Sequence, residues 1–419
     1  MTNRFSNSLN RCLAVLLVVF AFCLGQAQTI DNNPLVKQEI LEQVTAILSK
    51  NAFVPGVDFS KWPDFLKAEQ GLIDASNNDD EFQKAVNLAL KKFGASHTVL
   101  NAPKTADLRL TGEMVGIGIS TRVVPDGLLV TRTVPNAPAD RGGIIPGDTI
   151  KLIDGKPAKA ASAIEGDEGT DVTLTVAHPN KDTEDYILTR RKFSAIRPEE
   201  LHWVTKDTVL LSVNTFGFSY DRKRVSEFMS EAQTAKHLIL DLRGNGGGEI
   251  GNLRHLLGYL TPFDKPVGTF IDRSIADDYT KAIHGDIKDL AAIAKWTKKK
   301  LRPIVDQNVP IFTGTIAVLI DGQSGSASEI AAQGLRDVLG SKVLGSKSAG
   351  AVLVSLYVGA TNGFMLQFPL SDYVTIHGVR LEGLGVTPDI VVPDTGLHPT
   401  LETDPVVQKA LSVLEEKKG

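Results

Sequence analysis

The chain has 419 residues, of which 42% are hydrophobic and 22% charged, and its formal net charge is −4. This length accommodates two or three domains with sizeable cores, and the composition is typical of soluble globular proteins. A mildly acidic chain whose one basic run, residues 295–302, fits a solvated helix end gives no support for nucleic-acid binding.

The first 27 residues have the layout of a secretory signal peptide. Arg4 and Arg11 precede an apolar run over residues 12–24, and the small residues Gly25 and Ala27 follow it. The run is short for a membrane span, so we expect cleavage near Ala27 and a periplasmic or secreted mature protein without a membrane span. The alternative is an uncleaved N-terminal anchor.

Both cysteines, Cys12 and Cys23, lie inside this segment. A mature protein that begins after Ala27 would have no cysteine. We therefore expect neither a disulfide framework nor a cysteine metal site.

Residues 28–105 are expected to form a helical region. Apolar side chains recur there at helical spacing in two stretches: Val36, Ile40, Val44, Ile47 and Leu48, then Phe82, Ala85, Val86, Leu88 and Ala89. At its end stands Gly94-Ala95-Ser96-His97-Thr98. A lone histidine after a helix is usually structural or faces solvent.

Residues 106–194 are β-rich, with strand-like patterns at 115–119, 128–133, 150–153 and 172–176. The run Ala137-Pro-Ala-Asp-Arg-Gly-Gly-Ile-Ile-Pro-Gly147-Asp148, ending in Asp154-Gly155, closely resembles the PDZ motif. A glycine-rich segment stands where PDZ modules hold their carboxylate-binding loop: Gly116, Ile117, Gly118 and Ile119. In such a loop, backbone N–H groups converge on the carboxylate of a peptide that adds to the sheet edge. The alternative is a tight turn without a ligand.

The patterns in residues 195–395 predict an α/β core. Strand patterns at 209–213 and 238–242 alternate with helical patterns at 222–234 and 250–260, and a charged helical segment over 265–310 has the character of an insertion. A late strand region over 363–379 and a C-terminal helix over 396–419 complete the expected chain.

The glycine run after the second strand has two interpretations. Gly246-x-Gly248-x-x-Gly251 fits the dinucleotide fingerprint, but a run saturated with glycine matches it easily, and a secreted protein meets little free NAD. The other use of such a loop is to expose a backbone N–H to a reacting oxyanion.

A buried-strand pattern over 316–320 runs through a polar turn into Ser326-Ala327-Ser328-Glu329. The turn would place Ser326 at the start of a helix, where free N–H groups and the helix dipole favour a developing anion. Such a serine can be a nucleophile. It can equally be a cap, because Ser326 and Glu329 have the spacing of a capping box.

The order of these motifs resembles the tail-specific, or C-terminal-processing, serine peptidases over residues 90–395. A PDZ-like module is followed by Asp241-x-Arg243-x-Asn245-x-Gly-Gly, by Ser326-Ala-Ser-Glu, and by Glu382-Gly-x-Gly-Val-x-Pro-Asp389. The resemblance implies a PDZ-like β domain and an α/β peptidase core of the ClpP/crotonase type. It places the nucleophile on Ser326 and the oxyanion hole on the N–H groups of Ala327 and Gly247, with Gly246 and Gly248 as neighbouring alternatives.

One departure bears on the mechanism. Members with a Ser-Lys dyad carry their lysine at the position of Ala351, and a methyl group cannot accept a proton. The branch typified by the tricorn core protease uses a Ser-His-Ser-Glu tetrad instead. Besides Ser326, the residues of this sequence that the resemblance aligns with the tetrad are His97, Ser96 and Glu382. His97 would then deprotonate Ser326, while Glu382 would act through Ser96 to hold the imidazole.

Simpler interpretations of these residues stay open. Ser96 could bond only the backbone of its own turn, and Glu382 could be a surface acid at a strand end. Lys347, four places before Ala351, is an alternative base, although the peptide direction at that offset disfavours it.

The resemblance implies a serine endopeptidase that cleaves protein or peptide substrates by acyl transfer, with no metal or organic cofactor. The PDZ-like domain would bind free C-termini of substrates or gate the site. The alternative is a catalytically inactive PDZ-containing scaffold on the same fold. This alternative is suggested by Ala351, which stands where members with a Ser-Lys dyad carry their lysine. The sequence is compatible with a monomer or an oligomer.

Overall fold

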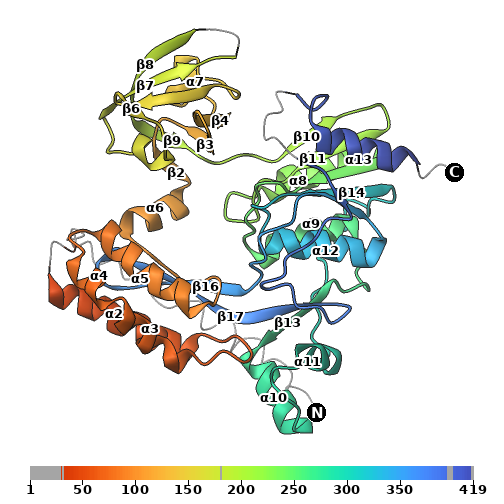
Figure 1. Ribbon diagram of the computed structural model, residues 1–419. Helices are drawn as coiled ribbons and strands as arrows, with labels where there is room; N and C mark the ends of the chain where they lie inside the picture. The colour runs from red at the N-terminus through yellow and green to blue at the C-terminus, as the bar shows by residue number, and fades with distance from the viewer. Residues whose placement is uncertain (1–29, 31–32, 180–181, 394–399, 417–419) are drawn as a thin grey trace.

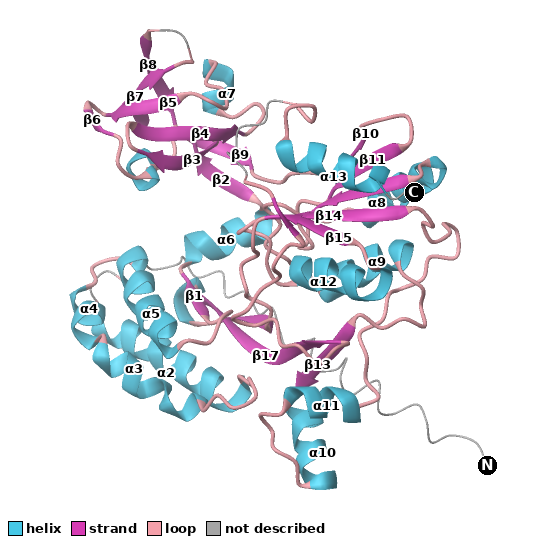
Figure 2. Ribbon diagram, turned by 45° about the vertical axis from the view of Figure 1, so that its right-hand side comes forward, coloured by secondary structure: helices cyan, strands magenta, loops and turns pink. Residues whose placement is uncertain are grey.

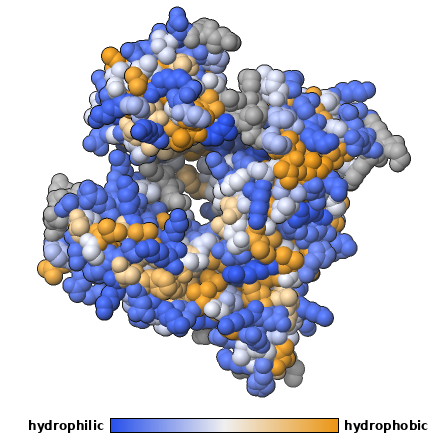
Figure 3. Space-filling model, in the orientation of Figure 1, coloured by the Kyte–Doolittle hydropathy of each residue, from blue (hydrophilic) through white to orange (hydrophobic). Residues whose placement is uncertain are grey.

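The computed structural model describes residues 30, 33–179, 182–393 and 400–416. It shows a β-rich part, an α/β core, and a second sheet covered by the N-terminal helices (Figure 1; Figure 2). The surface is hollowed where these three parts meet (Figure 3). The predicted signal peptide lies outside the described residues, and within them no helix is both long and apolar enough to cross a membrane.

The core sheet has the strand order β10-β11-β12-β14-β15-β18, in which only β10 is antiparallel to its neighbour. Its strands are β10 (Glu200–Trp203), β11 (Thr208–Ser212), β12 (His237–Asp241), β14 (Thr315–Ile320), β15 (Lys342–Gly345) and β18 (Ile390–Val391). Because the carboxyl ends of parallel strands meet at one edge, the loops after β11, β12, β14 and β15 gather there.

Alternate side chains of these strands face two different helical layers, as the pleat of a strand requires. Leu238 and Leu240 of β12 pack with helices on one face, whereas Ile239 packs with α13 on the other. The helices are α8 (Arg222–Glu231), η3 (Ala232–Thr234), α9 (Ile250–Leu260) and α12 (Ala327–Leu339) on the first face, and α13 (Pro405–Glu416) on the second. The expected α/β fold class is confirmed.

A second sheet joins distant parts of the chain. Its order is β1-β17-β13, and β16 also pairs with β17. Its strands are β1 (Val99–Asn101), β13 (Gly268–Asp272), β16 (Val354–Gly359) and β17 (Met365–Thr375), with η4 (Thr361–Gly363) between the last two. All pairs are antiparallel, and Leu100 lies opposite Leu366.

Two of these strands correct the sequence predictions. β1 lies in the region expected to be helical, and β13 lies in the segment 265–310, for which charged helices were expected. Both are short, and their partner strand follows far later in the chain, so no local pattern marks them. The rest of that segment does contain helices, α10 (Arg273–Ile283) and α11 (Leu290–Trp296).

The N-terminal helices pack on this second sheet. Phe82 and Trp62 share an apolar cluster with Leu100 of β1 and Leu366 of β17. The helices are α2 (Pro34–Asn51), η1 (Phe59–Lys61), α3 (Trp62–Ala68), α4 (Gln70–Ala75), α5 (Asp79–Phe93) and α6 (Pro103–Thr111). Asn78 caps the start of α5, and Gly94, with φ of 89°, ends it, so the chain turns directly into β1.

The β-rich part is attached through a ribbon of β2 (Glu113–Gly116) and β9 (Arg191–Ser194). Its sheet has the order β3-β4-β5-β7-β8, and β6 pairs with β5. The elements are β3 (Ile119–Val124), β4 (Gly127–Thr133), α7 (Pro138–Gly142), β5 (Thr149–Ile153), β6 (Lys156–Pro157), η2 (Ala161–Ile164), β7 (Asp171–Ala177) and β8 (Thr183–Thr189). The strand predicted over 115–119 is broken at Ile117 and Gly118, because Gly118 adopts φ of 76° and Ile117 turns into the core.

Candidate active site

Ser326 stands on the turn between β14 and α12. Its backbone has φ of 53° and ψ of −114°, a strained conformation for a residue with a side chain. The helix begins at the next residue, Ala327, whose N–H lies in the first turn, where backbone donors lack partners within the helix. A strained serine on a strand-to-helix turn is the geometry of a nucleophile elbow.

Hydrogen bonds to the glycine loop after β12 hold this turn in place. Asn245 is fully buried, and its carbonyl accepts from Gly325 N at 3.0 Å and from Ser328 Oγ at 2.8 Å. Asp321 Oδ1 accepts from Gly244 N at 2.9 Å. Two loops that are far apart in sequence thus form one rigid unit at the carboxyl edge of the sheet.

Gly247 touches Ser326 so closely that a side chain would not fit. A Cβ on Gly247 would lie 2.6 Å from Ser326 Cβ and 3.0 Å from Ala327 N. The Gly247 N–H, however, donates to Asn245 Oδ1 at 2.9 Å. In the described part of the chain, the N–H of Gly248 donates no hydrogen bond. The predicted donor from Gly247 is therefore engaged in this conformation, whereas the N–H groups of both neighbouring alternatives, Gly246 and Gly248, donate to no described group.

Ala351, which the resemblance aligns with the lysine of the Ser-Lys dyad, is hydrogen-bonded to the serine backbone. Its carbonyl accepts from Ser326 N at 2.9 Å. Lys347 is exposed and makes no hydrogen bond or ion pair with any described residue. Among the described residues, the structure therefore shows no hydrogen bond between Lys347 and Ser326.

Ser96 and His97 form a hydrogen-bonded pair between α5 and β1. Ser96 Oγ lies 2.8 Å from His97 Nδ1, and His97 has φ of 55°. Burial lowers the pKa of His97, and the negative charge of Glu382 opposes that effect. A histidine with a lowered pKa stays neutral, and able to accept a proton, over a wider range of pH.

Glu382 follows β17 in the chain, and its negative charge lies close enough to His97 to favour the protonated imidazole. Its Oε2 accepts from Val352 N at 2.7 Å. Nearby, the buried Asp372 of β17 pairs with Arg380, with Oδ2 and Nε 2.7 Å apart. The loop that carries Glu382 is thereby tied both to β17 and to the segment after Ala351.

The structure thus brings the predicted residues into two groups. Ser326, Ala327 and Gly247 form one, and Ser96, His97 and Glu382 form the other. Among the described residues, no hydrogen bond joins His97 to Ser326 or Glu382 to Ser96.

The predicted carboxylate loop lies between β2 and β3. The carbonyl of Ile117 accepts from Ala139 N at 2.9 Å, and that of Gly118 accepts from Val134 N at 2.7 Å. The N–H groups of Ile117 and Gly118 donate to no group in the described ranges. A Cβ on Gly118 would lie 2.2 Å from Ala137 Cβ. The loop therefore carries unused donors in a conformation that requires glycine.

Sequence reasoning treated Glu329 only as half of a capping box. The structure shows the Glu329 half of that box, with Oε2 accepting from Ser326 N at 2.9 Å. The same carboxylate also bonds residues 348–351, a contact that no sequence spacing could reveal.

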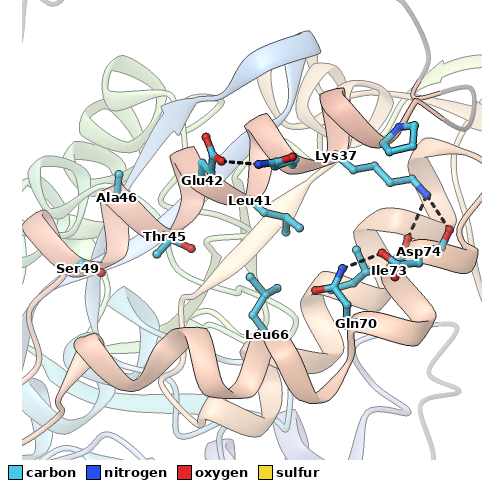
Figure 4. Close-up of a pocket in the computed structure, with 12 residues that line it drawn as sticks. Lys37, Leu41, Glu42, Thr45, Ala46, Ser49, Leu66, Gln70, Ile73 and Asp74 are labelled. Carbon is cyan, nitrogen blue, oxygen red and sulfur yellow. Dashed lines mark hydrogen bonds between the residues drawn. The ribbon is translucent and has the colours of Figure 1, made fainter.

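A separate groove of about 790 Å³ lies between α2, α3 and α4 (Figure 4). Leu41, Leu66 and Ile73 provide apolar walls, and Lys37 Nζ donates to carbonyls at the end of α4, including that of Ser76 at 2.6 Å. The groove contains none of the predicted site residues. In the ranges that the structure describes, no three His, Cys, Asp or Glu side chains form a group that could hold a metal ion.

Comparisons with known proteins agree with this architecture. The model of peptidase family S41 matches residues 207–392. A "Probable CtpA-like serine protease" of Staphylococcus aureus (strain MRSA252) is 27% identical over 340 residues, which are 78% of this chain and 63% of that protein. A "Carboxy-terminal-processing protease" of Bartonella bacilliformis is 26% identical over 329 residues, 75% of this chain and 70% of that protein.

Among solved structures, the photosystem II D1 C-terminal processing protease has the same fold, with a TM-score of 0.51 and 19% identity over 89% of this chain and 96% of that one. The stretch that matches the model of peptidase family S41 spans most of the α/β core, and the two relatives extend the similarity over about three quarters of the chain. The chain spans just under two thirds of the length of the Staphylococcus relative.

Proposed function

We propose that the protein is a serine endopeptidase of the C-terminal-processing type, with Ser326 as its nucleophile. The observation that carries the proposal is the strained backbone of Ser326 at the start of α12, with Gly247 directly beside it. Strain of this kind needs a surrounding structure that fixes it, and it clusters at catalytic sites. The match of residues 207–392 to the model of peptidase family S41 supports the same reaction class.

In the proposed reaction, His97 Nε2 removes the proton of Ser326 Oγ as that oxygen attacks the scissile carbonyl. The N–H of Ala327 and an N–H of the glycine loop stabilise the oxyanion. The intermediate collapses, the peptide C–N bond breaks, and the imidazolium gives its proton to the leaving amine. Water then attacks the acyl-enzyme by the same route and releases the acid and Ser326.

Ser96 and Glu382 complete the proposed tetrad as positioning residues. The 2.8 Å contact between Ser96 Oγ and His97 Nδ1 leaves Nε2 as the nitrogen for Ser326. Since catalytic hydrogen bonds are often long without substrate and tighten in its complex, we expect a substrate to draw the two groups together.

The β-rich part would act as a PDZ-like module that holds a substrate C-terminus. The support is the pair of unused N–H groups at Ile117 and Gly118, together with β3 at the edge of its sheet. An extended peptide would add to β3 and end with its carboxylate on this loop. The proposed substrates are proteins or peptides with free C-termini, and the N-terminal signal motif favours a periplasmic or secreted location.

A direct test is cleavage of a peptide with a free C-terminus, followed by mass spectrometry. We expect wild type to cut it and Ser326→Ala to lose activity while still binding it. A fully active Ser326→Ala variant would reject the proposal.

One observation favours a second candidate, a binding scaffold without catalysis. Ala351 replaces the dyad lysine, and in the described residues His97 makes no hydrogen bond to Ser326. The scaffold predicts that wild type binds C-terminal peptides without turnover, and that neither Ser326→Ala nor His97→Ala changes this binding.

A further inference from the structure

Glu329 is the third residue of α12, and its side chain is fully buried. Burial raises the pKa of Glu329, and hydrogen bonds to its carboxylate oppose that effect. A buried acid of this kind needs strong partners to stay ionised.

Four donors converge on this carboxylate. Oε1 accepts from Ser348 Oγ at 2.5 Å and from Gly350 N at 2.8 Å. Oε2 accepts from Ser326 N at 2.9 Å and from Ala351 N at 3.1 Å. A carboxylate offers about four acceptor positions, so all of them are in use. A helix cap would need only the bond to Ser326.

The donors come from two different loops. One is the strained serine turn, and the other is the segment 348–351 after β15. The second loop is in turn hydrogen-bonded to the segment that carries Glu382, since Gly383 N donates to the Gly350 carbonyl at 2.8 Å and Val386 N donates to Ser348 Oγ at 2.6 Å. One carboxylate thus connects the nucleophile turn to the loop that carries Glu382.

We propose that Glu329 is a positioning residue that fixes the backbone of Ser326 and its alignment with the Glu382 loop. This inference rests on the proposed peptidase function and assigns to its site a residue that does not touch substrate. It requires the ionised carboxylate, because a protonated or amidated side chain cannot accept all four bonds.

Glu329→Gln tests this requirement with little change of shape. The amide has one acceptor oxygen, and its NH₂ group would face two of the four donors whichever way it turns. The serine turn should then shift, and a displacement of about 1 Å can cost roughly 10²-fold in rate. Ser348→Ala removes a single donor and should have a smaller effect. Gln333→Ala is the matched control, because Gln333 lies on the same helix and its side chain bonds Asp337 and Arg336 of that helix rather than either loop.

The experiment measures the rate and the final stoichiometry of Ser326 labelling by a fluorophosphonate, together with kcat and KM for a cleaved peptide. We expect Glu329→Gln to lower the labelling rate and kcat by about 10²-fold, with KM changed by less than about twofold and full final labelling. We expect an intermediate loss in Ser348→Ala and none in Gln333→Ala.

The outcomes separate the two claims. A Glu329→Gln variant that labels and turns over like wild type would overturn the positioning role. The role is also overturned if only part of the variant labels, at the wild-type rate, because that pattern means a loss of folded protein. If Glu329→Gln does not fold, an unaltered rate in Ser348→Ala overturns the role instead. A wild type that never labels at Ser326 would reject the peptidase function itself, and the positioning role with it.

Discussion

Ser96 Oγ and His97 Nδ1 lie 2.8 Å apart, joined by a hydrogen bond within a left-handed turn at His97. This contact occupies the nitrogen nearer to the backbone. It leaves Nε2 as the atom that can exchange a proton with a substrate or with Ser326.

Removal of the imidazole should abolish most of the activity. We expect His97→Ala to lower kcat by roughly 10²- to 10⁴-fold, the usual contribution of a general base. Ser96→Ala should cost less, because the base remains and only its orientation relaxes. The measurement is kcat for a cleaved peptide, with circular dichroism as the check on folding. Equal activity of His97→Ala and wild type would place the base elsewhere.

The pH dependence should carry the signature of His97. In the proposed mechanism the neutral imidazole is the active form, and burial lowers the pKa of His97 while Glu382 opposes this. Activity should therefore persist on the acid side of the ordinary histidine value of about 6.5 and fall at lower pH. Glu382→Gln removes the opposing charge, so the acid limb of kcat/KM should move to still lower pH. A limb that moves upward in Glu382→Gln would contradict the proposed placement.

Gly247 should not tolerate a methyl group. In Gly247→Ala the new Cβ would meet Ser326 Cβ at 2.6 Å, at a φ of 98° that strains any side chain. We expect a loss of at least roughly 10²-fold in kcat through displacement of the serine turn. Gly246→Ala is the matched control, since no atom lies within 4 Å of its added Cβ. Similar kinetics of the two variants would show that the glycine loop does not shape the site.

The carboxylate loop makes a prediction about ligands. A peptide with a free C-terminus should bind at least about tenfold more tightly than its C-terminal amide, because hydrogen bonds to a charged group contribute roughly 1.5–3 kcal/mol. Isothermal titration calorimetry on Ser326→Ala would measure this without cleavage. Equal affinities for the free peptide and its amide would contradict carboxylate binding by the loop Gly116–Ile119.

Arg243 should matter for stability. It pairs with Asp241 at 2.6 Å and with Asp404 at 2.7 Å, which anchors the start of α13 to the end of β12. Burial alone would lower the pKa of Arg243, but the two carboxylates raise it. Arg243→Ala should reduce the free energy of unfolding by about 3 kcal/mol, because it leaves both acids without this cation.

Lys223→Ala provides the control for that experiment. It breaks an exposed pair with Glu227 at 3.7 Å and should cost less than about 0.5 kcal/mol. Urea denaturation of the three proteins would measure the difference. Equal midpoints for Arg243→Ala and Lys223→Ala would show that the buried pairs do not stabilise the fold.

Local patterns in the sequence predicted the α/β core well. The strand before Asp241 and the helix over 250–260 appear where their periodicity placed them, because each buries its apolar face within the core. Of the second sheet, only β17 lies in a predicted strand region, 363–379. β1 has three residues, and its pairing with β17 depends on contacts between the two ends of the chain.

The candidate site shows the same division. Ser326 could be found from its strand-to-helix turn, since that signal is local. The fourfold bonding of Glu329 could not, because three of its donors belong to residues 348–351 and reach it only in the folded chain. The sequence likewise could not show that the N–H of Gly247 is engaged, because that hydrogen bond is made to the side chain of Asn245 in the folded loop.

The central claim is that Ser326 is an activated nucleophile with His97 as its base. The most direct test is to incubate the protein with a biotinylated fluorophosphonate and locate the adduct by peptide mass spectrometry, with His97→Ala in parallel. The account predicts an adduct on Ser326 that forms much more slowly in His97→Ala. A folded wild-type protein that binds C-terminal peptides and yet forms no adduct at Ser326 would contradict it.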